Sequence, residues 1–460
     1  MKVHFIGIGG IGMSGLANIC MSFGYEVSGS DSQSTYLTEE LKQKGARIFL
    51  GQCASNIDKS YDMIVYTAAI HPDNTEFIAA KNSGIRMMSR AEFLGHVMDK
   101  YKTTFAISGT HGKTTTTSML STIFNNADLD PTILVGGNLQ SIHGNYRVGK
   151  SENFITEACE YTDSFLNLHP TTAVILNVEP DHLDYFKNLD NIIKSFHTFS
   201  TGVKPNGFIV ANGDEENVRK ALSDIKGVIF YGRKDGNDVI ITKETLVSDG
   251  CKKFFIKFND RLIGPFILKV PGDHNVLNAT AAAVSALVNG LDYKAVSDGL
   301  SSYSGVDRRF QYKGEYRGIR IFDDYAHHPS EIKATLHAAS YLEKRKLIVI
   351  FQPHTFSRTK ALLDDFSKAF DEADTVILTD IYASRETDTG EISSETLAEK
   401  ISANGKQTVY LSDFKKVEDY ITRHVGKNDV VFTMGAGDVY KIGEYLVECN
   451  EKTEKQQNTV

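Results

Sequence analysis

The sequence lacks the cysteine pattern of a disulfide-rich or zinc-binding protein. Its 460 residues contain five cysteines, an odd number, and no two of them form a CxxC pair. This spacing indicates neither a disulfide framework nor a zinc cluster, and it is typical of a protein from a reducing compartment. The five positions are Cys20, Cys53, Cys159, Cys251 and Cys449.

An excess of positive charge and long apolar segments are also missing. The formal net charge is −8, so no general basic field attracts nucleic acid, and a polyanionic ligand needs a local site. No apolar run approaches the roughly 20 residues of a membrane helix. The apolar N-terminus has no clear basic segment followed by a cleavage site. We therefore expect a cytoplasmic protein that binds neither nucleic acid nor membrane.

The length and the strand–helix pattern predict three α/β domains. Apolar runs of strand length alternate with helical stretches, which predicts parallel, doubly wound sheets. Short alternating runs between about 239 and 271 predict a small antiparallel sheet, and the polar tail 448–460 is expected to fray. The expected domains are 1–101, 102–305 and 306–460. The strands expected in the second and third domains include Phe154–Ala158, Ala173–Val178, Arg320–Phe322, Leu347–Phe351, Thr375–Thr379 and Val430–Met434, and a helix is expected at Thr114–Ala127.

The most specific motif is GTHGKTTTT at 109–117, which follows a strand and opens a helix. Glycines let the backbone wrap a phosphate, the helix N-terminus offers N–H donors, and Lys113 supplies a cation. Thr114 suits a magnesium ion that bridges the phosphates. The loop is shorter than GxxxxGK[ST]. A plain glycine turn is disfavoured because four consecutive threonines are poor helix formers. The pattern predicts a nucleotide-phosphate site.

A second glycine turn lies at the N-terminus. Gly7, Gly9 and Gly12 form GxGxxG directly after the first strand, and Asp31 ends the next strand. In dinucleotide-binding units such glycines admit a pyrophosphate and the acid holds a ribose hydroxyl. The same geometry accepts a UDP-sugar. NAD, a UDP-sugar and a turn without a ligand therefore remain alternatives on this motif alone.

Together with these two glycine segments, a series of further segments resembles the Mur ligases. They occur in order over essentially the whole chain: NVEPDHLDYF at 177–186, GDHNVLNATAA at 272–282, GVDRRFQ at 305–311, DDYAHHPSEI at 323–332, FQPHTFSRT at 351–359 and GAGDV at 435–439. The resemblance implies a Rossmann-like UDP-binding domain, a central P-loop ATPase domain and a Rossmann-like C-terminal domain that closes over an amino acid.

The resemblance is strongest to the branch of the family that adds L-alanine. It implies that ATP, with Mg²⁺, phosphorylates the lactyl carboxylate of UDP-N-acetylmuramate, and that the amine of L-alanine attacks the acyl phosphate. The product would be an intermediate of peptidoglycan, and the enzyme is expected to be a monomer or weak dimer.

The resemblance also implies a set of site residues. The UDP-sugar would be bound by Gly7, Gly9, Gly10, Gly12 and Asp31. ATP would be bound by Gly109, Thr110, His111, Gly112, Lys113, Thr114, Thr115, Asn275, Asn278, Arg308 and Asp324. The metal would be bound by Thr114, Glu157 and His182, and the amino acid by Tyr325, His327, His354 and Arg358. Lys113, His182, His327 and Arg358 would take part in catalysis.

Several of these residues have structural alternatives. We expect Glu160, close to Glu157, to be a solvated loop acid. His182 could be a loop histidine bonded to backbone, and Asn275 a helix cap. One arginine of the pair 308–309 is expected to be only a surface charge.

Two positions depart from the patterns of relatives. His197 stands where many relatives have a carbamylated lysine, and we predict no such modification. Thr355 replaces an arginine of some relatives beside the amino-acid site.

Other functions explain less of the chain. A dehydrogenase accounts for the first glycine turn only, and a P-loop switch protein for the second only. A folate-type polyglutamate ligase lacks such a first domain. The recycling ligase that adds a preformed tripeptide to the same sugar nucleotide is the nearest alternative, but its first glycine segment resembles GICGTFMGGLA more than GIGGIGMSGLA.

Overall fold

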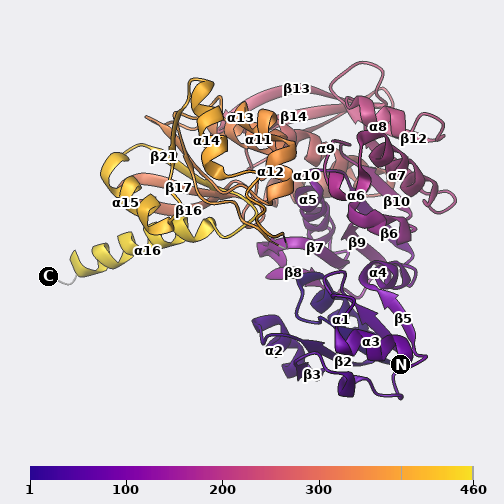
Figure 1. Ribbon diagram of the computed structural model, residues 1–460. Coiled ribbons are helices and arrows are strands. Elements are labelled where there is room, and N and C mark those ends of the chain that lie inside the picture. Colours follow the sequence, from indigo (N-terminus) through magenta and orange to yellow (C-terminus); the bar gives the residue numbers. More distant parts are fainter. Residues whose placement is uncertain (385, 458–460) are drawn as a thin grey trace. The chain divides into compact units, whose positions relative to one another are not determined.

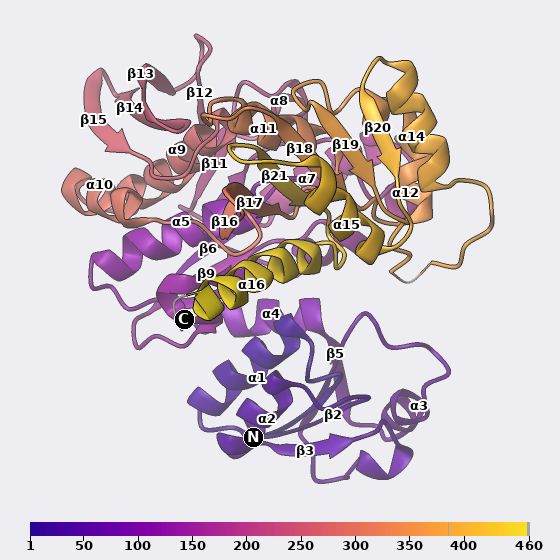
Figure 2. The same cartoon turned by 90° about the vertical axis from the view of Figure 1, so that its left-hand side faces the viewer.

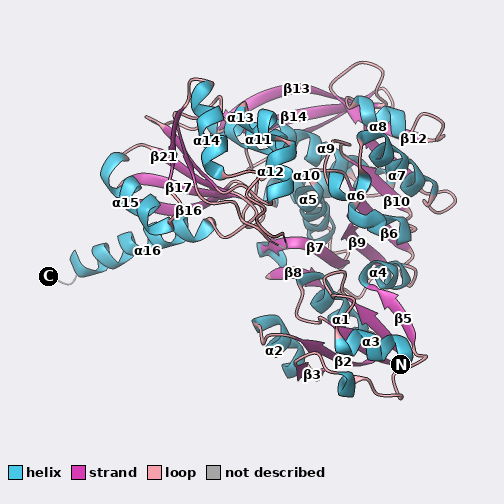
Figure 3. Cartoon of the chain, viewed as in Figure 1, coloured by secondary structure: helices cyan, strands magenta, loops and turns pink. Residues whose placement is uncertain are grey.

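The protein is an α/β chain with three sheets, seen here in a computed structural model that describes residues 1–384 and 386–457 (Figure 1). Helices and strands alternate through most of the chain (Figure 3). This confirms the predicted α/β class and its three-domain organisation.

The N-terminal sheet has five parallel strands in the order β3-β2-β1-β4-β5. The order reverses beside β1, which is where open α/β sheets bind ligands, outside the carboxyl ends of the strands. The elements are β1 (Lys2–Ile6), α1 (Ile11–Ser22), β2 (Glu26–Asp31), α2 (Tyr36–Gln43), β3 (Arg47–Leu50), η1 (Ala54–Asn56), β4 (Met63–Tyr66), α3 (Thr75–Asn82), β5 (Arg86–Ser89) and α4 (Arg90–Met98).

Alternation along β1 explains why helices cover both faces of this sheet. Val3 and Phe5 are buried in the large core that also contains Leu16 of α1, whereas Ile6 packs in a separate cluster with Ala80 of α3. A side chain's face alternates along a strand, so one short apolar strand supplies both cores.

The central sheet has ten strands in the order β15-β14-β13-β12-β11-β10-β6-β9-β7-β8. Strands β6, β7 and β9 to β12 pair in parallel, and β8 pairs antiparallel with β7. The strands are β6 (Thr103–Ser108), β7 (Thr132–Leu139), β8 (Gly144–Arg147), β9 (Asn153–Glu157), β10 (Thr172–Ile175), β11 (Phe208–Asn212), β12 (Val228–Gly232), β13 (Val239–Ser248), β14 (Cys251–Phe258) and β15 (Arg261–Ile267).

The expected small antiparallel sheet corresponds to β13, β14 and β15, whose two-residue connections impose antiparallel pairing. These strands extend the central sheet instead of forming a separate one, because β13 pairs with β12. The remaining elements of this region are α5 (Lys113–Asn126), η2 (Gln140–Ile142), η3 (Tyr161–Asn167), α6 (Leu183–Phe186), α7 (Leu189–Thr201), α8 (Glu216–Ala221), α9 (Asp273–Val288) and α10 (Tyr293–Ser302).

The C-terminal sheet has six strands in the order β16-β17-β21-β18-β19-β20, with β16 antiparallel and the others parallel. Figure 2 shows β18, β19 and β20 in succession beside α14. The elements are β16 (Gln311–Tyr316), β17 (Ile319–Asp324), α11 (Pro329–Ser340), β18 (Leu347–Phe351), α12 (Phe356–Ala361), α13 (Leu363–Ser367), β19 (Thr375–Leu378), α14 (Ser394–Ala403), β20 (Gln407–Tyr410), α15 (Phe414–His424), β21 (Val430–Met434) and α16 (Tyr440–Gln457).

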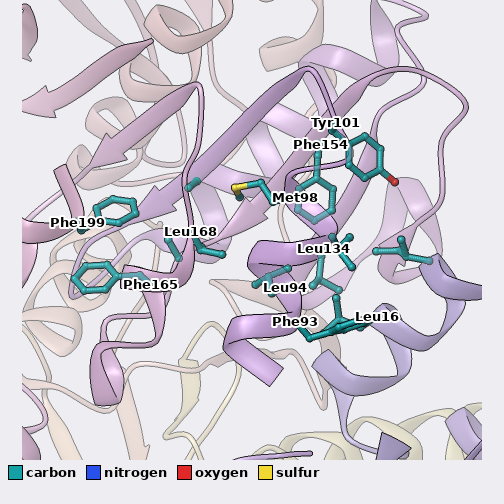
Figure 4. Packing of buried hydrophobic residues seen from close by; sticks show 14 of the residues in the cluster. Leu16, Phe93, Leu94, Met98, Tyr101, Leu134, Phe154, Phe165, Leu168 and Phe199 are labelled. Atoms are coloured by element: carbon teal, nitrogen blue, oxygen red, sulfur yellow. The ribbon is translucent and has the colours of Figure 1, made fainter. Parts of the chain in front are cut away.

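The chain forms two compact units. One comprises Met1–Ile241, Ile256–Ile263 and Asn278–Leu300, and the other comprises Thr242–Phe255, Gly264–Leu277 and Ser301–Val460. Within the first unit, one apolar core joins the N-terminal and central sheets (Figure 4). Its contacts hold the glycine turn of the first sheet and the phosphate loop of the second in one body.

Two further expectations concern the ends of elements. The tail was expected to fray from residue 448, but α16 continues to Gln457, and residues 458–460 lie outside the described part. Apolar positions on one face of α16, such as Ile442 and Leu446, anchor its first turns against the sheet. Among the described residues, no helix combines the length and apolar character needed to cross a membrane.

Candidate functional site

The loop that joins β6 to α5, residues 109–112, is called the phosphate loop here. It contains two glycines with positive φ. Gly109 has φ 141° and Gly112, the N-cap of α5, has φ 85°. A Cβ at Gly112 would lie 2.7 Å from Oδ1 of Asn278, so the backbone approaches that amide closely. Glycine is required here by both the backbone angle and the available space.

Lys113, the first residue of α5, folds back over this loop. Its Nζ donates to the carbonyl oxygens of Gly109 and Thr110 and to both carboxylate oxygens of Glu160, at 2.8 and 3.1 Å. Burial alone would lower the pKa of Lys113, but the Glu160 carboxylate outweighs it and raises the pKa. The ammonium is therefore charged, and its hydrogen bonds hold it against the loop backbone.

The expectation that Glu160 is a solvated loop acid is wrong. Its side chain is only 3% exposed and it pairs with Lys113. The chain turns sharply after Glu160, where Thr162 and Asp163 both adopt left-handed conformations with φ 54° and 56°. A buried carboxylate is tolerated when a cation compensates its charge, which Lys113 does.

Asn177, which the sequence reasoning did not single out, fixes the first half of the loop. Its Oδ1 accepts the N–H of His111 at 2.8 Å, its Nδ2 donates to the carbonyl of His111, and its own carbonyl accepts the N–H of Thr110. The hydroxyl of Thr110 accepts the N–H of Glu179. The available signal was a polar residue just beyond the apolar β10, at the carboxyl end where ligands bind.

Of the predicted metal ligands, His182 lies near Glu160. Its Nε2 is 3.9 Å from Oε1 of Glu160 and 3.8 Å from Oδ2 of Asp181. Its ring lies 4.4 Å from that of Tyr161, and its backbone is left-handed with φ 51°. Histidine is one of the few residue types besides glycine that adopt this conformation with some frequency.

Glu157 ends β9, as predicted, but its carboxylate turns toward the β7–β8 hairpin. Oε1 accepts the N–H of Gly136 at 2.6 Å. Glu157 and Gly136 also line a cavity of about 260 Å³, together with Gly12 and Arg90 of the N-terminal region. Thr114 follows Lys113 in the first turn of α5 and is partly exposed.

The N-terminal glycine turn is organised by the end of β2. The carbonyl of Ser30 accepts the N–H groups of Gly7 and Ile8 at 2.8 and 3.0 Å. Oδ2 of Asp31 accepts the N–H of Gly9 at 2.8 Å. Asp31 therefore shapes the turn directly, and Gly10 follows as the N-cap of α1.

The predicted amino-acid residues form a row of rings at the carboxyl ends of β17 and β18. The rings of Tyr325 and His327 lie 5.4 Å apart, and those of His327 and His354 lie 5.7 Å apart. Nη1 of Arg358 is 3.2 Å from Nδ1 of His354. Because a guanidinium can only donate, Nδ1 accepts and the ring proton of a neutral His354 lies on Nε2.

The row continues to a residue that was not predicted, Tyr382. Its ring stacks on His354 with the centroids 5.7 Å apart. Tyr382 donates its N–H to the carbonyl of Pro353 and accepts the N–H of Thr355, which holds the two segments together. Thr355 itself has φ 67°, a strained angle for a β-branched residue.

Two predicted ATP ligands of the C-terminal sheet are engaged within it. Arg308 pairs with the buried Asp323 at 3.1 Å and donates to the carbonyl of Gly435. The carboxylate of Asp324 accepts the N–H groups of Phe310 and Ala326 at 2.7 and 2.8 Å. Burial raises the pKa of Asp324 to about 6.

Two other positions were open questions. Nδ2 of Asn275, the third residue of α9, donates to the carbonyl of Pro271 at 2.6 Å, and this bond is not a helix cap because a cap accepts a backbone N–H. His197 lies on α7 with Nδ1 3.0 Å from the carbonyl of Ala221. This ring therefore contacts the end of α8, and Nδ1 also lies 3.4 Å from Oδ1 of Asp224.

Comparison with known protein families gives matches along almost the whole chain. Residues 2–102 match the Mur ligase family catalytic domain, residues 107–286 the Mur ligase middle domain, and residues 308–437 the Mur ligase glutamate ligase domain.

Curated relatives and solved structures agree with these matches. The chain is 47% identical to a UDP-N-acetylmuramate–L-alanine ligase of Caldanaerobacter subterraneus over 98% of both chains, and 48% identical to one of Acetivibrio thermocellus over 97% of this chain and 95% of the relative. The crystal structure of UDP-N-acetylmuramate-alanine ligase from Thermotoga maritima superposes with a TM-score of 0.81 at 30% identity, covering 98% of this chain and 100% of that one. A murein peptide ligase of Psychrobacter arcticus superposes with a TM-score of 0.68 at 26% identity, covering 97% and 98%.

Proposed function

We propose that this chain, which belongs to the Mur ligase family, joins L-alanine to the lactyl carboxylate of UDP-N-acetylmuramate. The products are UDP-N-acetylmuramoyl-L-alanine, ADP and phosphate, and the reaction belongs to peptidoglycan synthesis. We assign it to the cytoplasm, where ATP is supplied and where five free cysteines persist.

The observation that carries the proposal is the Lys113–Glu160 pair at the phosphate loop. In the first step a carboxylate oxygen attacks the γ-phosphorus of ATP and ADP leaves. Two anions must meet, so the site needs a concentrated positive charge. Lys113 supplies it, the N–H groups at the start of α5 bind phosphate oxygens, and the amide of Asn278 lies against the same loop for the adenine nucleotide.

The donor set around the loop fits a magnesium ion. Glu160 and His182 approach each other to 3.9 Å, and Thr114 lies in the first turn of α5, next to Lys113. Oxygen donors and carboxylates suit Mg²⁺. We propose Thr114, Glu157 and His182 as its protein ligands and add Glu160 because of its position. When bound, the metal would offset the charge of the β- and γ-phosphates.

The glycine turn at 7–12 would hold the diphosphate of the UDP-sugar against the N-terminus of α1. Asp31 and Gly10 support it through the contacts of the turn. The cavity that reaches from Gly12 to Glu157 then has the position required for the muramic acid, whose carboxylate must lie near the phosphate loop.

In the second step the amine of L-alanine attacks the acyl carbon, phosphate leaves and the amine loses a proton. We assign alanine binding to Tyr325, His327, His354 and Arg358. Arg358 suits the alanine carboxylate because its guanidinium can donate two parallel bonds. The neutral His354 beside it adds a ring face and one N–H.

We also propose domain boundaries at 101/102 and 305/306. The boundaries between the family matches, at 102–107 and 286–308, support them. We propose Asn275, Arg308 and Asp324 as further ATP ligands.

The nearest second candidate is addition of a preformed tripeptide to the same sugar nucleotide, because a murein peptide ligase shares the fold at 26% identity. The test is to supply ATP, Mg²⁺ and UDP-N-acetylmuramate with either L-alanine or the tripeptide and to measure ADP release. We expect release with L-alanine. Release with the tripeptide alone would assign the recycling reaction. A parallel assay with NAD is followed by absorbance, and NAD reduction without ADP release would refute the ligase.

A further inference from the structure

We propose that Arg90 binds the diphosphate of the sugar nucleotide. It reaches from the start of α4 to the N-terminal glycine turn, residues 7–12. The inference rests on the proposed function and deepens it, because it assigns the cation that the glycine turn itself does not contain.

The position of Arg90 is rigidly set. It is the first residue of α4 and directly follows β5, so its backbone lies at the carboxyl end of the sheet. Ser89 and Glu92 form a capping box around it, with Ser89 N–H donating to Glu92 at 2.6 Å and Glu92 N–H donating to the Ser89 hydroxyl at 3.2 Å. This cap fixes the helix start.

The guanidinium lies against the glycine turn. A Cβ placed on Gly12 would be 3.3 Å from Nη1 of Arg90 and 3.5 Å from its Cδ. The side chain therefore occupies the space that a larger residue at position 12 would need. It also lines the cavity of about 260 Å³ that continues to Glu157.

The charge of Arg90 has no counter-charge among the described residues, where it forms neither an ion pair nor a side-chain hydrogen bond. Within residues 1–384 and 386–457, the charged side chain that bonds to the glycine turn is Asp31, which is acidic. A diphosphate would bring further negative charge to this place. Arginine is well suited to such a ligand because its planar donors pair with two phosphate oxygens.

The experiment separates the diphosphate from the rest of the ligand. Binding of uridine, UDP, UDP-N-acetylglucosamine and UDP-N-acetylmuramate is measured by calorimetry on the full-length enzyme and on Arg90→Met, Arg90→Lys and Arg86→Met. Arg86 is the matched control, because it is an exposed arginine at the start of β5, the strand that directly precedes Arg90.

For Arg90→Met we expect unchanged uridine binding and a loss of about 10- to 100-fold for the three diphosphates, the usual value of a charge-assisted contact. Arg90→Lys should recover part of this loss, since it keeps the charge but not the paired donors. Arg86→Met should bind all four ligands as the wild type does. The thermal midpoint of each variant verifies folding.

Two results would overturn the assignment. Equal weakening of uridine and UDP would show that Arg90 only supports the domain. Weakening confined to UDP-N-acetylmuramate would place Arg90 on the lactyl carboxylate. A failure of the proposed function is distinguishable, because the wild-type enzyme would then release no ADP with L-alanine, whereas the Arg90 comparison is read from UDP binding.

Discussion

The protein contains two strand–glycine–helix turns, and they differ in where their charge comes from. The loop between β6 and α5 carries its own cation, Lys113, paired with the buried Glu160. The turn between β1 and α1 contains no cation, and its bonded side chain is the carboxylate of Asp31. A guanidinium beside Gly12, that of Arg90, comes from another helix.

The proposed function accounts for this difference through the fate of the phosphate at each turn. A phosphoryl group that is transferred changes its charge distribution during the reaction, so a cation must sit in the loop itself. A diphosphate that only anchors a substrate needs a fixed site and uniform binding. Glycine turns of similar sequence can therefore serve catalysis in one domain and anchorage in another.

The strongest test of this comparison is Lys113→Ala. We expect ADP formation to fall by about 1,000-fold or more, because a cation on the transferring phosphoryl group is lost. Calorimetry should find UDP-N-acetylmuramate binding close to wild type. Lys102→Ala, a change at an exposed lysine, is the control. Activity above a few per cent would mean that Lys113 does not hold the transferred phosphate.

The second test compares two glutamates beside the loop. Glu160→Gln should raise the Mg²⁺ concentration needed for half-maximal activity by about tenfold or more, because it removes a carboxylate close to both Lys113 and His182. Glu157→Gln should have the smaller effect, since this carboxylate accepts a backbone N–H. Mg²⁺ titrations of ADP release measure both. The reverse order would make Glu157 the stronger metal ligand of the two and would remove the reason for adding Glu160.

A weaker effect is expected in the anchoring turn. Asp31→Ala removes the acceptor of the Gly9 N–H and should raise KM for UDP-N-acetylmuramate about tenfold, the value of a bond to a charged group. KM for ATP should not change. If kcat fell instead while KM stayed constant, the turn would contribute to the chemistry and the comparison would fail.

The smallest effects come from the glycines themselves. Gly112→Ala places a side chain at φ 85° and against Asn278, and should cost about 1–2 kcal/mol of unfolding free energy. Gly10→Ala has φ −66° and meets no atom closer than 3.6 Å, so its thermal midpoint should match the wild type. Equal midpoints for the two variants would show that the phosphate loop relaxes easily.

The sequence predicts best where a signal is local. The apolar run LIVIF was expected at Leu347–Phe351 and is β18, and the helix expected after the phosphate loop is α5, shifted by one residue. A continuous apolar run marks a strand buried on both faces, and glycine before a threonine-rich stretch marks a helix start.

The structure was needed where direction depends on tertiary contacts. Glu160 is buried because it pairs with Lys113, a contact between residues 47 positions apart that no local pattern predicts. Arg90 lies where β5 (RMMS, 86–89) meets α4 (which begins RAE). This junction matches no known phosphate-binding motif. Tyr382 joins His354 across an isolated bridge between segments that are 28 positions apart.

Because Glu160 pairs with Lys113, its carboxylate would compete with a nucleotide phosphate for the same ammonium. A γ-phosphate that binds Lys113 would displace the Glu160 carboxylate from the ammonium. Glu160 is buried, so its negative charge would then need another cation nearby. A nucleotide that arrives with a divalent cation provides that partner, whereas a bare nucleotide adds a second uncompensated anion. Under the proposed function, the Lys113–Glu160 contact would therefore favour a nucleotide that carries its metal over one that does not.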